Sequence, residues 1–507
     1  MARYKSYNYN QGKFIPISFD KQILPGTFEH TLAYVIDNEF DLSIFNDRYS
    51  NDETGAPAYD PAILLKIIFY AYSRGITSSR KIEQCCRENI IFMALSCDTQ
   101  PHFTTIADFV STLDSEIVRL FLEVLLVCDQ MNLIGKEMFA IDGVKLPSNA
   151  SKEWSGTKEE LSHKKEKMEE AIRKVMARHK EVDEQNIPPQ EEQYIATLAE
   201  NVKKIRTFLA ENDDKPGKTG TPIKSNITDN ESAKIKTSKG VIQGYDGVAM
   251  VDAKHQVIVH AEAFGAPQEQ DLLIPMIDGT TENFTALGNH DVFETTTLTA
   301  DSGFHSESNM EMLEEKQIDA YIADGQMRKR DGRFADRDRY KERFNKDRAA
   351  YYGTTTTFVA DQFTLSEDKT FCICPAGKRL HRNGAHVKVR GTTAIKFRSN
   401  KTDCVACPLR TKCLRNPDRS ETRQVYFFRR KPESFTERMK QKIDSLKGRL
   451  LYNRRLATVE PVFANIRSTL RLDRFTLRGK RKVNIQWLLY CMVHNLLKVH
   501  RYGYGNA

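Results

Sequence analysis

Two short apolar runs, far apart in the sequence, each end in an aspartate. The run at 138–141 leads into Asp142, the run at 298–300 leads into Asp301, and glycine follows each aspartate within two residues. Short apolar runs bounded by turn-forming residues are typical of buried strands. We therefore predict that both aspartates lie at strand ends that open into turns, which requires a fold with a buried sheet.

A third carboxylate, Glu460, lies in a segment with helical periodicity. Between Leu451 and Phe463 apolar residues recur at helical spacing, and arginines surround the glutamate. Hard divalent cations prefer oxygen ligands, and their sites keep open positions for a substrate phosphate. A single acid more often caps a helix or forms a salt bridge. The three together predict a magnesium or manganese site made of Asp142, Asp301 and Glu460.

The length of the chain and its apolar pattern limit the classes of protein to which it can belong. A chain of 507 residues exceeds one ordinary core, so we expect two or three domains, some inserted in others. No run of 18 apolar residues occurs, and the polar start of the chain is unlike a signal peptide. These features predict a soluble cytoplasmic protein with no membrane partner.

Charge is distributed unevenly along the chain. Residues 1–327 contain 33 lysines and arginines against 52 aspartates and glutamates, whereas residues 328–507 contain 43 against 16. The two parts therefore carry −19 and +27, although the whole chain carries only +8. A strongly basic region attracts polyanions, and DNA is the partner we expect. A solvated basic surface without a specific role is the alternative.

The N-terminal part of the chain has helical patterns. An apolar helix is predicted at 61–70, with Asp60 as its N-cap and Gly75 after its end. Two more short helices are predicted, after 77–79 and near 104–106. Their spacing fits a helix-turn-helix DNA-binding domain. A small helical bundle used for dimerisation fits equally well.

A charged helical hairpin is predicted at 157–212. Apolar residues recur by threes and fours on both arms, and Pro188 and Pro189 separate the arms. Such an arm often spaces or dimerises subunits, and a charged spacer with no specific role is the alternative. The following residues, 213–240, are predicted to be a polar loop.

Strand patterns resume after this loop. The predicted elements are a β-hairpin at 241–251 and 256–263, a helix near 271–277, the strand that ends at Asp301, a helix near 307–316 and a strand at 320–322. Because helices and strands alternate around the aspartates, the predicted class is mixed α/β.

The motifs around the three carboxylates resemble those of bacterial insertion-sequence transposases with an RNase H-like DDE catalytic core. The matching pieces are Ile141-Asp142-Gly143, Asn149-Ala150-Ser151, Gly244-Tyr245, Ala300-Asp301-Ser302-Gly303 and Val459-Glu460-Pro461-Val462-Phe463. An Asp-Gly pair alone usually marks a turn, but the order of these pieces is specific. The resemblance implies an RNase H-like mixed sheet flanked by helices, with two aspartates on strands and the glutamate on a helix beyond an insertion.

The resemblance also implies the chemistry. Such an enzyme binds two Mg²⁺ or Mn²⁺ ions through Asp142, Asp301 and Glu460, cleaves the ends of its insertion sequence and transfers the 3′-hydroxyl ends to target DNA. Its partners are the terminal inverted repeats and target DNA, it is expected at the nucleoid, and a homodimer is expected because two ends must be paired. The alternatives are a related metal-dependent DNA nuclease and a non-enzymatic, zinc-stabilised DNA-binding protein derived from a transposase.

The helix that carries Glu460 resembles a Tyr…Arg…Glu…Lys signature found in part of this superfamily. Tyr452 and Arg455 match it in kind, and Arg467 stands where lysine is usual, although four residues rather than three separate Arg455 from Glu460. At about 100° per residue, Glu460, Arg467 and Arg449 share one face. Arg455 is predicted to point elsewhere, so Arg467 is the preferred phosphate contact. Further DNA contacts are predicted at Arg478, Lys480, Arg481 and Lys482.

Five of the ten cysteines cluster between Cys372 and Cys413. The two-residue spacer between Cys404 and Cys407 lets both thiolates reach one tetrahedral ion. Cys374 and Cys413 are predicted to complete a structural zinc site, and Cys372 could replace Cys374 because both lie on one strand face. Free buried thiols are the alternative, because the spacing is not that of a standard paired CxxC ribbon.

Two further features complete the pattern. Basic residues from Arg328 to Arg343, interleaved with aromatic residues, are predicted to contact a nucleic-acid backbone or, alternatively, to pair with acids of their own helix. A closing apolar helix is predicted at 485–499, with Trp487 and His494 in the core.

The predicted segments are a helical domain at 1–135, an RNase H-like core at 136–156, 240–327 and 435–507, a helical hairpin and linker at 157–239, and a basic, cysteine-containing insertion at 328–434.

Overall fold

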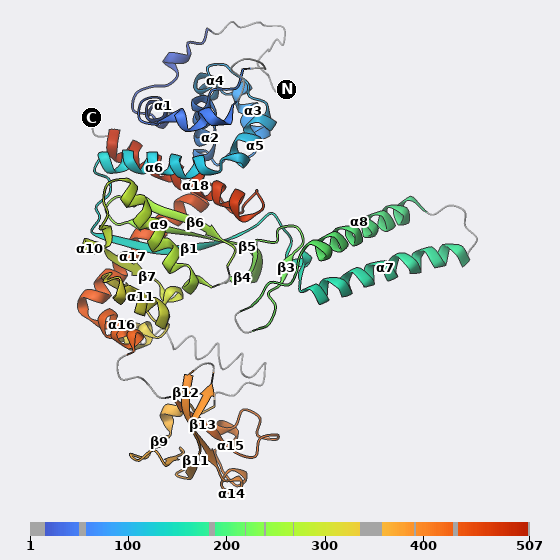
Figure 1. Ribbon diagram of the computed structural model, residues 1–507, viewed down its shortest axis with the longest axis vertical. Helices are drawn as coiled ribbons and strands as arrows, with labels where there is room; N and C mark the ends of the chain where they lie inside the picture. The colour runs from blue at the N-terminus through green and yellow to red at the C-terminus, as the bar shows by residue number, and fades with distance from the viewer. Residues whose placement is uncertain are drawn as a thin grey trace, which may run out of the picture. The chain divides into compact units, whose positions relative to one another are not determined.

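Contacts divide the chain into two compact units in the computed structural model. Unit 1 consists of residues 1–323 and 446–507, and unit 2 of residues 324–445. Figure 1 shows the elements of both units. The structure describes residues 16–49, 57–181, 188–217, 220–237, 240–266, 268–334, 357–389, 392–428 and 434–504.

Unit 1 begins with short helices, as predicted. The described helices are α1 (Phe28–Asn38), α2 (Pro61–Ser73), α3 (Ser79–Glu88), α4 (Ile90–Leu95), α5 (Phe103–Thr112) and α6 (Ser115–Gln130). The predicted cap of α2 is confirmed, because the Asp60 carboxylate accepts a hydrogen bond from the Ala62 amide at 2.8 Å. Helix α4 has no counterpart in the prediction, since six residues are too few for a clear periodicity. Helices α2, α5 and α6 pack against α18 (Lys480–Lys498), which belongs to the other end of the chain.

The predicted helical hairpin is present. Its arms are α7 (Lys158–Glu181) and α8 (Pro189–Glu211), which pack against each other. Arg206 of the second arm forms an ion pair with Glu169 of the first at 2.9 Å. Figure 1 shows the two helices side by side, projecting from the base formed by β2 (Ser155–Gly156) and β3 (Ser225–Asn226).

A six-stranded sheet forms the centre of unit 1. Its strands are β1 (Met138–Pro147), β4 (Ala233–Thr237), β5 (Gly240–Asp252), β6 (Ile258–Phe264), β7 (Thr297–Ala300) and β8 (Ala320–Ile322). The order is β4-β5-β1-β7-β8, with β6 also paired to β5. Strand β1 is antiparallel to β5 and parallel to β7, and β7 is parallel to β8. The mixed sheet flanked by helices confirms the predicted α/β class and is consistent with an RNase H-like fold.

Asp142 lies inside a strand, so its predicted position at a strand end is wrong. Strand β1 continues to Pro147 because β5 pairs with it along almost its whole length. The other neighbour, β7, pairs with β1 only as far as Ala300. Asp301 does follow a strand end, as predicted, and its side chain accepts a hydrogen bond from the Gly303 amide at 2.7 Å.

The segment predicted as a polar loop, 213–240, contains the edge strand β4. Ala233 and Ile235 are buried in this strand while Lys236 is exposed. Such a short alternation does not stand out among its polar neighbours. The predicted helices on either side of Asp301 are present as α9 (Leu273–Ala286) and α11 (Glu307–Glu315), and the short helix α10 (Val292–Thr295), which was not predicted, lies between α9 and β7.

Helix α17 (Leu446–Ala464) carries Glu460 across the sheet, where it contacts β1, β5, β7 and β8. It contains Pro461, whose lack of an N–H leaves the carbonyl of Ala457 without its helical donor. The side-chain amide of Gln256 donates to this carbonyl at 3.0 Å. The helix therefore passes through the proline without an unsatisfied carbonyl and continues into the π-helical turn Asn465–Thr469.

The closing helix α18 is a core element, as predicted. Trp487 is fully buried, and its indole N–H donates to the Val248 carbonyl at 3.0 Å. A Cβ on Gly247 would lie 3.1 Å from the indole ring, so glycine allows this close approach. His494 is also buried and contacts the carbonyl of Gln256 at 2.9 Å.

Unit 2 contains a five-stranded antiparallel sheet. Its order is β13 (Gln424–Phe428), β12 (Thr392–Ser399), β11 (Arg379–Val389), β10 (Phe371–Ile373) and β9 (Thr364–Leu365). The core of this sheet is small and consists of the buried residues Phe363, Cys372, Leu380, Ile395, Phe397 and Val425. Short helices α14 (Lys401–Val405) and α15 (Arg410–Cys413) follow β12.

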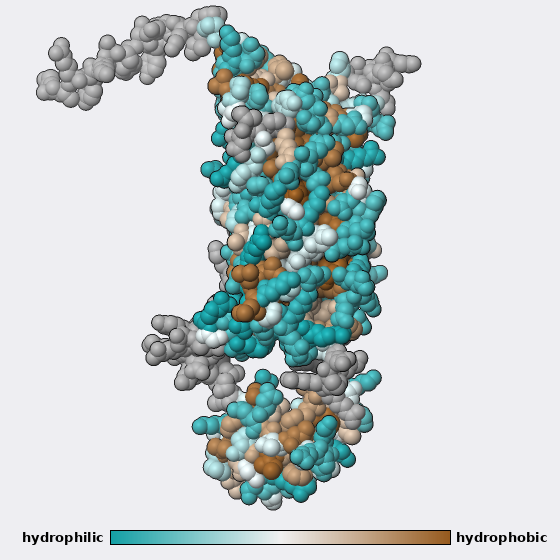
Figure 2. Space-filling model, turned by 90° about the vertical axis from the view of Figure 1, so that its left-hand side faces the viewer, coloured by the Kyte–Doolittle hydropathy of each residue, from teal (hydrophilic) through white to brown (hydrophobic). Residues whose placement is uncertain are grey.

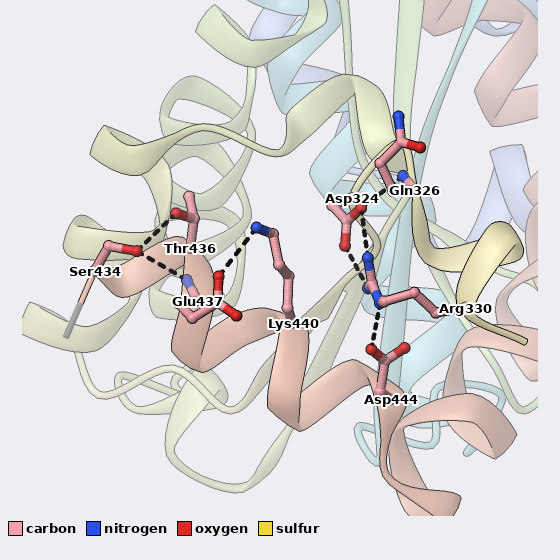
Figure 3. A network of polar contacts seen from close by, with 8 residues as sticks. All are labelled: Asp324, Gln326, Arg330, Ser434, Thr436, Glu437, Lys440 and Asp444. Carbon is pink, nitrogen blue, oxygen red and sulfur yellow. Dashed lines mark hydrogen bonds and ion pairs between the residues drawn. The ribbon is translucent and has the colours of Figure 1, made fainter. Parts of the chain in front are cut away.

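Polar contacts join the two ends of the unit 2 segment. Arg330, the last residue of α12 (Met327–Arg330), donates to both carboxylate oxygens of Asp324, at 2.5 and 3.1 Å. Its Nε also donates to Asp444 at 2.6 Å, at the end of α16 (Phe435–Asp444). Figure 3 shows this network. The chain therefore enters and leaves unit 2 at neighbouring points, as an inserted segment must.

Two described cations of the basic segment after residue 327, Arg330 and Arg333, form ion pairs, and Arg328 and Lys329 are exposed. Arg330 binds two aspartates, and Arg333 forms an ion pair with Asp331 at 2.7 Å. Only the Arg333–Asp331 pair is of the kind that the alternative predicts, because Arg330 pairs with acids outside the basic segment. The remaining predicted cations, from Arg337 to Arg343, lie outside the described residues.

The surface carries hydrophobic residues scattered among hydrophilic ones on the face seen in Figure 2. Leu446 and Leu450, at the start of α17, are the most exposed of the large hydrophobic residues in the described part of the chain, at 90% and 70%.

None of the described helices combines the length and the apolar character needed to cross a membrane.

Candidate active site

Asp142 and Asp301 come from neighbouring strands. In the parallel pairing of β1 with β7, Ile141 lies opposite Ala300, so the next residue of each segment is one of the two aspartates. They are close enough for the charge of Asp301 to raise the pKa of Asp142. The structure thus brings together two predicted carboxylates that are far apart in the sequence.

Asp142 is largely buried and ion-paired. Burial raises its pKa, and the positive charge of Arg455 opposes that shift. Arg455 Nη1 lies 3.1 Å from Asp142 Oδ2, and the Gly143 amide donates to Oδ1 at 2.9 Å. The side chain of Arg455 is 5% exposed and that of Asp142 is 24% exposed. The arginine therefore partly compensates a carboxylate that has lost most of its water.

The prediction that Arg455 points away from the site is wrong, because it contacts Asp142. Helix α17 packs on β1, so the helix face turned toward the sheet meets this carboxylate. Tyr452 is also buried, and the Arg455 guanidinium lies 5.4 Å from the centre of its ring. The prediction used only the angles of residues around the helix axis. Because these angles do not tell which face of the helix packs on the sheet, the predicted direction of Arg455 was wrong. Arg455 therefore belongs to the site, and Tyr452 packs beside it.

A cavity of about 490 Å³ opens beside Asp142. Glu460 and Arg467 line it, as expected for residues on one helix face, and the other lining residues are Gly143, Val144, Phe463, Ala464, Ser468 and Asp473. Both Glu460 and Arg467 are exposed, so they are accessible to a ligand in the cavity. Arg449 is half-buried in the first turn of α17 and is not a lining residue.

Three further charged residues surround the aspartates and are absent from the sequence predictions. Asp246 of β5 lies opposite Lys145 of β1 and is 1% exposed. Its Oδ1 has no hydrogen-bond partner in the described part of the protein. Burial, with the nearby charge of Glu269, raises the pKa of Asp246 to about 7. Lys145 Nζ forms an ion pair with Glu269 at 2.5 Å.

The glycines after the two aspartates make room for these acids. A Cβ on Gly143 would lie 2.6 Å from Asp246 Oδ1, and a Cβ on Gly303 would overlap the carboxylate of Glu269. Neither glycine has positive φ. Gly143 therefore marks no turn but a close approach of Asp246 to β1, whereas Gly303 lies in the predicted turn and also makes room for Glu269.

The site holds several acids near one another but no preformed ligand set. Among the described residues, no three His, Cys, Asp or Glu side chains are arranged closely enough to hold a metal ion. In this structure the Arg455 guanidinium occupies one oxygen of Asp142. A cation that binds Asp142 through that oxygen must therefore compete with the arginine.

The predicted DNA-contact residues after α17 lie at the start of α18. Arg478, Lys480, Arg481 and Lys482 are all exposed. Lys480 forms an ion pair with Glu262 at 2.8 Å and Arg481 with Asp114 at 2.9 Å. Acids of unit 1 therefore neutralise part of this predicted basic patch.

The four predicted zinc ligands also come together, in unit 2. Cys374, Cys404, Cys407 and Cys413 line a single cavity of about 30 Å³. Burial raises the pKa of Cys413, and the other three thiols are close enough to add to the shift. Cys372 lies instead in the hydrophobic core of the sheet, which removes it as the alternative ligand.

The protein is mixed α/β and consistent with the RNase H-like class, because helices flank its mixed sheet and acids gather beside α17. Residues 373–500 match a model described as a transposase DDE domain, and residues 17–112 match a transposase domain (DUF772). The two matches indicate an insertion-sequence transposase. The DDE-domain match contains Glu460 and the four cysteines, whereas Asp142 and Asp301 lie between the two matched segments. No curated protein matches the chain.

Replacing Arg455 is expected to destabilise unit 1 in the absence of metal. Breaking a buried ion pair costs about 3–5 kcal/mol, and because Asp142 keeps some exposure we expect about 2 kcal/mol for Arg455→Gln near pH 8. The loss should shrink at lower pH, where Asp142 is protonated. Urea unfolding in EDTA measures it through tryptophan fluorescence, since both tryptophans of the chain, Trp154 and Trp487, belong to unit 1.

The matched control for this experiment is Arg454→Gln. Arg454 precedes Arg455 on the same helix but is exposed. Its replacement should change stability by less than about 0.5 kcal/mol, as is usual for surface positions. Equal losses in the two variants would contradict a specific role for Arg455 in compensating Asp142.

Proposed function

We propose that this protein is a DDE transposase that cleaves the ends of an insertion sequence and joins the freed 3′-hydroxyl ends to target DNA. The observation that carries the proposal is the convergence of acids from three distant segments. Asp142 lies on β1, Asp301 directly follows the adjacent strand β7, and Glu460 shares an open cavity with Asp142. The matches to two transposase domains support the same activity.

The donor set fits a hard divalent cation. Asp142, Asp301 and Glu460 offer only oxygen atoms, which hard divalent cations prefer. Burial, with a smaller contribution from the charge of Asp301, raises the pKa of Asp142, and a bound cation would favour its ionised form. These three residues would hold Mg²⁺ or Mn²⁺, with two ions expected. When bound, the ions would activate the attacking oxygen and stabilise the leaving oxygen of an in-line displacement.

The side chains of the site have separate tasks in this proposal. Arg455 holds Asp142 in place through their ion pair. Arg467 lines the cavity and presents a cation that can bind a phosphate of the DNA backbone. The exposed cations Arg478 and Lys482 extend the positive charge along the chain after α17. Because two element ends must be processed together, we expect a homodimer in the active complex.

The test uses duplex DNA carrying the flanks of the coding region, which would contain the terminal inverted repeats. The full chain is incubated with labelled end DNA, a second unlabelled duplex, and Mg²⁺, Mn²⁺ or EDTA. A transposase should cleave at the element end only with metal and then join the labelled 3′ end to the second duplex. Gel analysis of strand products measures both steps.

The outcomes separate the three candidate functions. Metal-dependent cleavage without joining, at any ratio of the two duplexes, would identify a nuclease. Specific binding of the end DNA without cleavage in either metal would favour a DNA-binding protein derived from a transposase. Joining products that map to the element end are the result that supports the proposal.

A further inference from the structure

The cysteine cavity of unit 2 is built from three separate pieces of chain. Cys374 follows strand β10, Cys404 lies in α14 and Cys413 ends α15, with Cys407 in the turn between the two helices. All four thiols line one cavity of about 30 Å³. This volume exceeds the roughly 10–15 Å³ that one water molecule requires. The cavity therefore has room for a small ion.

The turn after Cys374 directs a backbone donor at its sulfur. The Lys378 amide donates to Cys374 Sγ at 3.3 Å, and the Gly377 amide donates to the Cys374 carbonyl at 2.8 Å. Gly377 has φ of +74°, a conformation that favours glycine. A hydrogen bond from an amide to sulfur stabilises the thiolate, which is the form that binds metals.

The loop that holds the other cysteines is braced mainly by hydrogen bonds to its backbone carbonyls. The Arg410 guanidinium donates to three carbonyl oxygens, those of Cys404, Pro417 and Ser420, at 2.9, 2.6 and 3.0 Å. The Ser399 hydroxyl lies 2.9 Å from Cys404 Sγ. The backbone around the cavity is thus positioned by hydrogen bonds before any ion binds.

The cavity also has the charge balance that a four-thiolate site needs. Four thiolates around one Zn²⁺ carry a net charge of −2, and the charged residues that line the same cavity, Lys378, Arg410, Arg423 and Asp403, sum to +2. The hydrophobic core of the sheet is small, and Cys374 and Cys413 pack against it. Domains with small cores commonly depend on a metal or a disulfide for stability.

We propose that Cys374, Cys404, Cys407 and Cys413 bind one structural Zn²⁺ as thiolates in tetrahedral geometry. The sulfurs do not yet surround one point, because no three such ligands in the described residues are arranged to hold an ion. Binding therefore turns the thiol side chains toward the centre of the cavity. Each thiol that becomes a thiolate releases a proton, so affinity rises with pH. This site is separate from the carboxylates and does not depend on the proposed DNA chemistry.

The first test measures metal in the full-length protein. Protein prepared under reducing conditions should contain one Zn²⁺ per chain by elemental analysis. After removal of the metal with a chelator, Co²⁺ should bind with the intense visible and near-ultraviolet absorption of tetrahedral thiolate coordination. Titration with Zn²⁺ should displace this absorption. Protein that binds neither ion at these thiols would overturn the proposal.

Variants assign the ligands. Cys407→Ser should weaken zinc binding by more than about 100-fold, because even the loss of a second-shell partner costs 10- to 100-fold. Cys97→Ser is the matched control, since Cys97 is an exposed free thiol in unit 1. It should keep full zinc content. Zinc that persists in Cys407→Ser, or is lost equally from both variants, would overturn the assignment.

A measurement on the unmodified protein covers the case in which a variant does not fold. A thiol-specific reagent added in small steps should release zinc in proportion to modified cysteines, and prior zinc binding should protect these thiols from modification. Mass spectrometry of the modified peptides identifies the cysteines. Disulfide bonds between Cys374, Cys404, Cys407 and Cys413 in freshly prepared protein, without zinc, would show a redox site instead.

Discussion

Asp142→Asn, Asp301→Asn and Glu460→Gln should each slow cleavage of the element end by more than about 10³-fold, because each removes an anionic ligand from a site whose catalysis depends on bound cations. The replacements keep the size of the side chains, so DNA binding at low metal concentration should remain close to that of the parent protein. Cleavage rates and DNA affinity are measured on the same preparations.

Asp278→Asn is the control for this series. Asp278 is an exposed residue of α9 that pairs with Lys316 at 2.6 Å, away from the carboxylate site. It should cleave at the parental rate. If any one of the three site variants also cleaves at the parental rate, that residue is not a ligand, and if all three do, the proposed site is wrong.

Asp246→Asn is expected to stabilise the metal-free protein at high pH. Folded Asp246 keeps its proton up to about pH 7, whereas the ordinary aspartate pKa is 3.8. Between pH 3.8 and about pH 7 the folded state therefore binds more protons at this residue than the unfolded state does. As a result, Asp246 lowers the free energy of unfolding as pH rises, and this loss is complete above about pH 7. At about 1.4 kcal/mol per pH unit, the upper limit of the cost is about 4 kcal/mol. Asparagine does not titrate, so the variant does not lose stability in this way as pH rises.

The stability gain should therefore depend on pH in a defined way. Urea unfolding in EDTA, followed by tryptophan fluorescence, should show little difference from the parent at about pH 4 and a gain of about 2–4 kcal/mol near pH 8. Trp487 is a suitable reporter because its indole contacts Gly247, next to Asp246. A gain of equal size at both pH values, or a loss near pH 8, would contradict a buried carboxylate that is costly to ionise.

Much of the site could be predicted from local sequence patterns. The strand leading to Asp301 and the helix carrying Glu460 each have a periodicity of their own, and a buried strand or helix must have this pattern to pack against the core. The capping residue Asp60 and the closing helix with Trp487 were predictable for the same reason. The spacing of Cys404 and Cys407 likewise limits both thiols to one neighbourhood.

Other features depend on segments that meet only after folding. Asp246 lies in a strand that has no marked motif at this position, and it becomes part of the site because β5 pairs with β1. Arg455 reaches Asp142 because α17 packs on the same sheet. Neither contact follows from spacing along the chain, since the partners come from different elements.

Residue type and local periodicity are enough to predict the mixed α/β class and to single out the three separate carboxylates and the four cysteines. Three features are visible only in the folded protein: Asp142 lies within a continuous strand, Arg455 forms an ion pair with it, and a second buried acid stands beside Gly143. The physical reason is that pairing and packing between distant segments set the burial and the charge around each group. Local sequence does not contain those contacts.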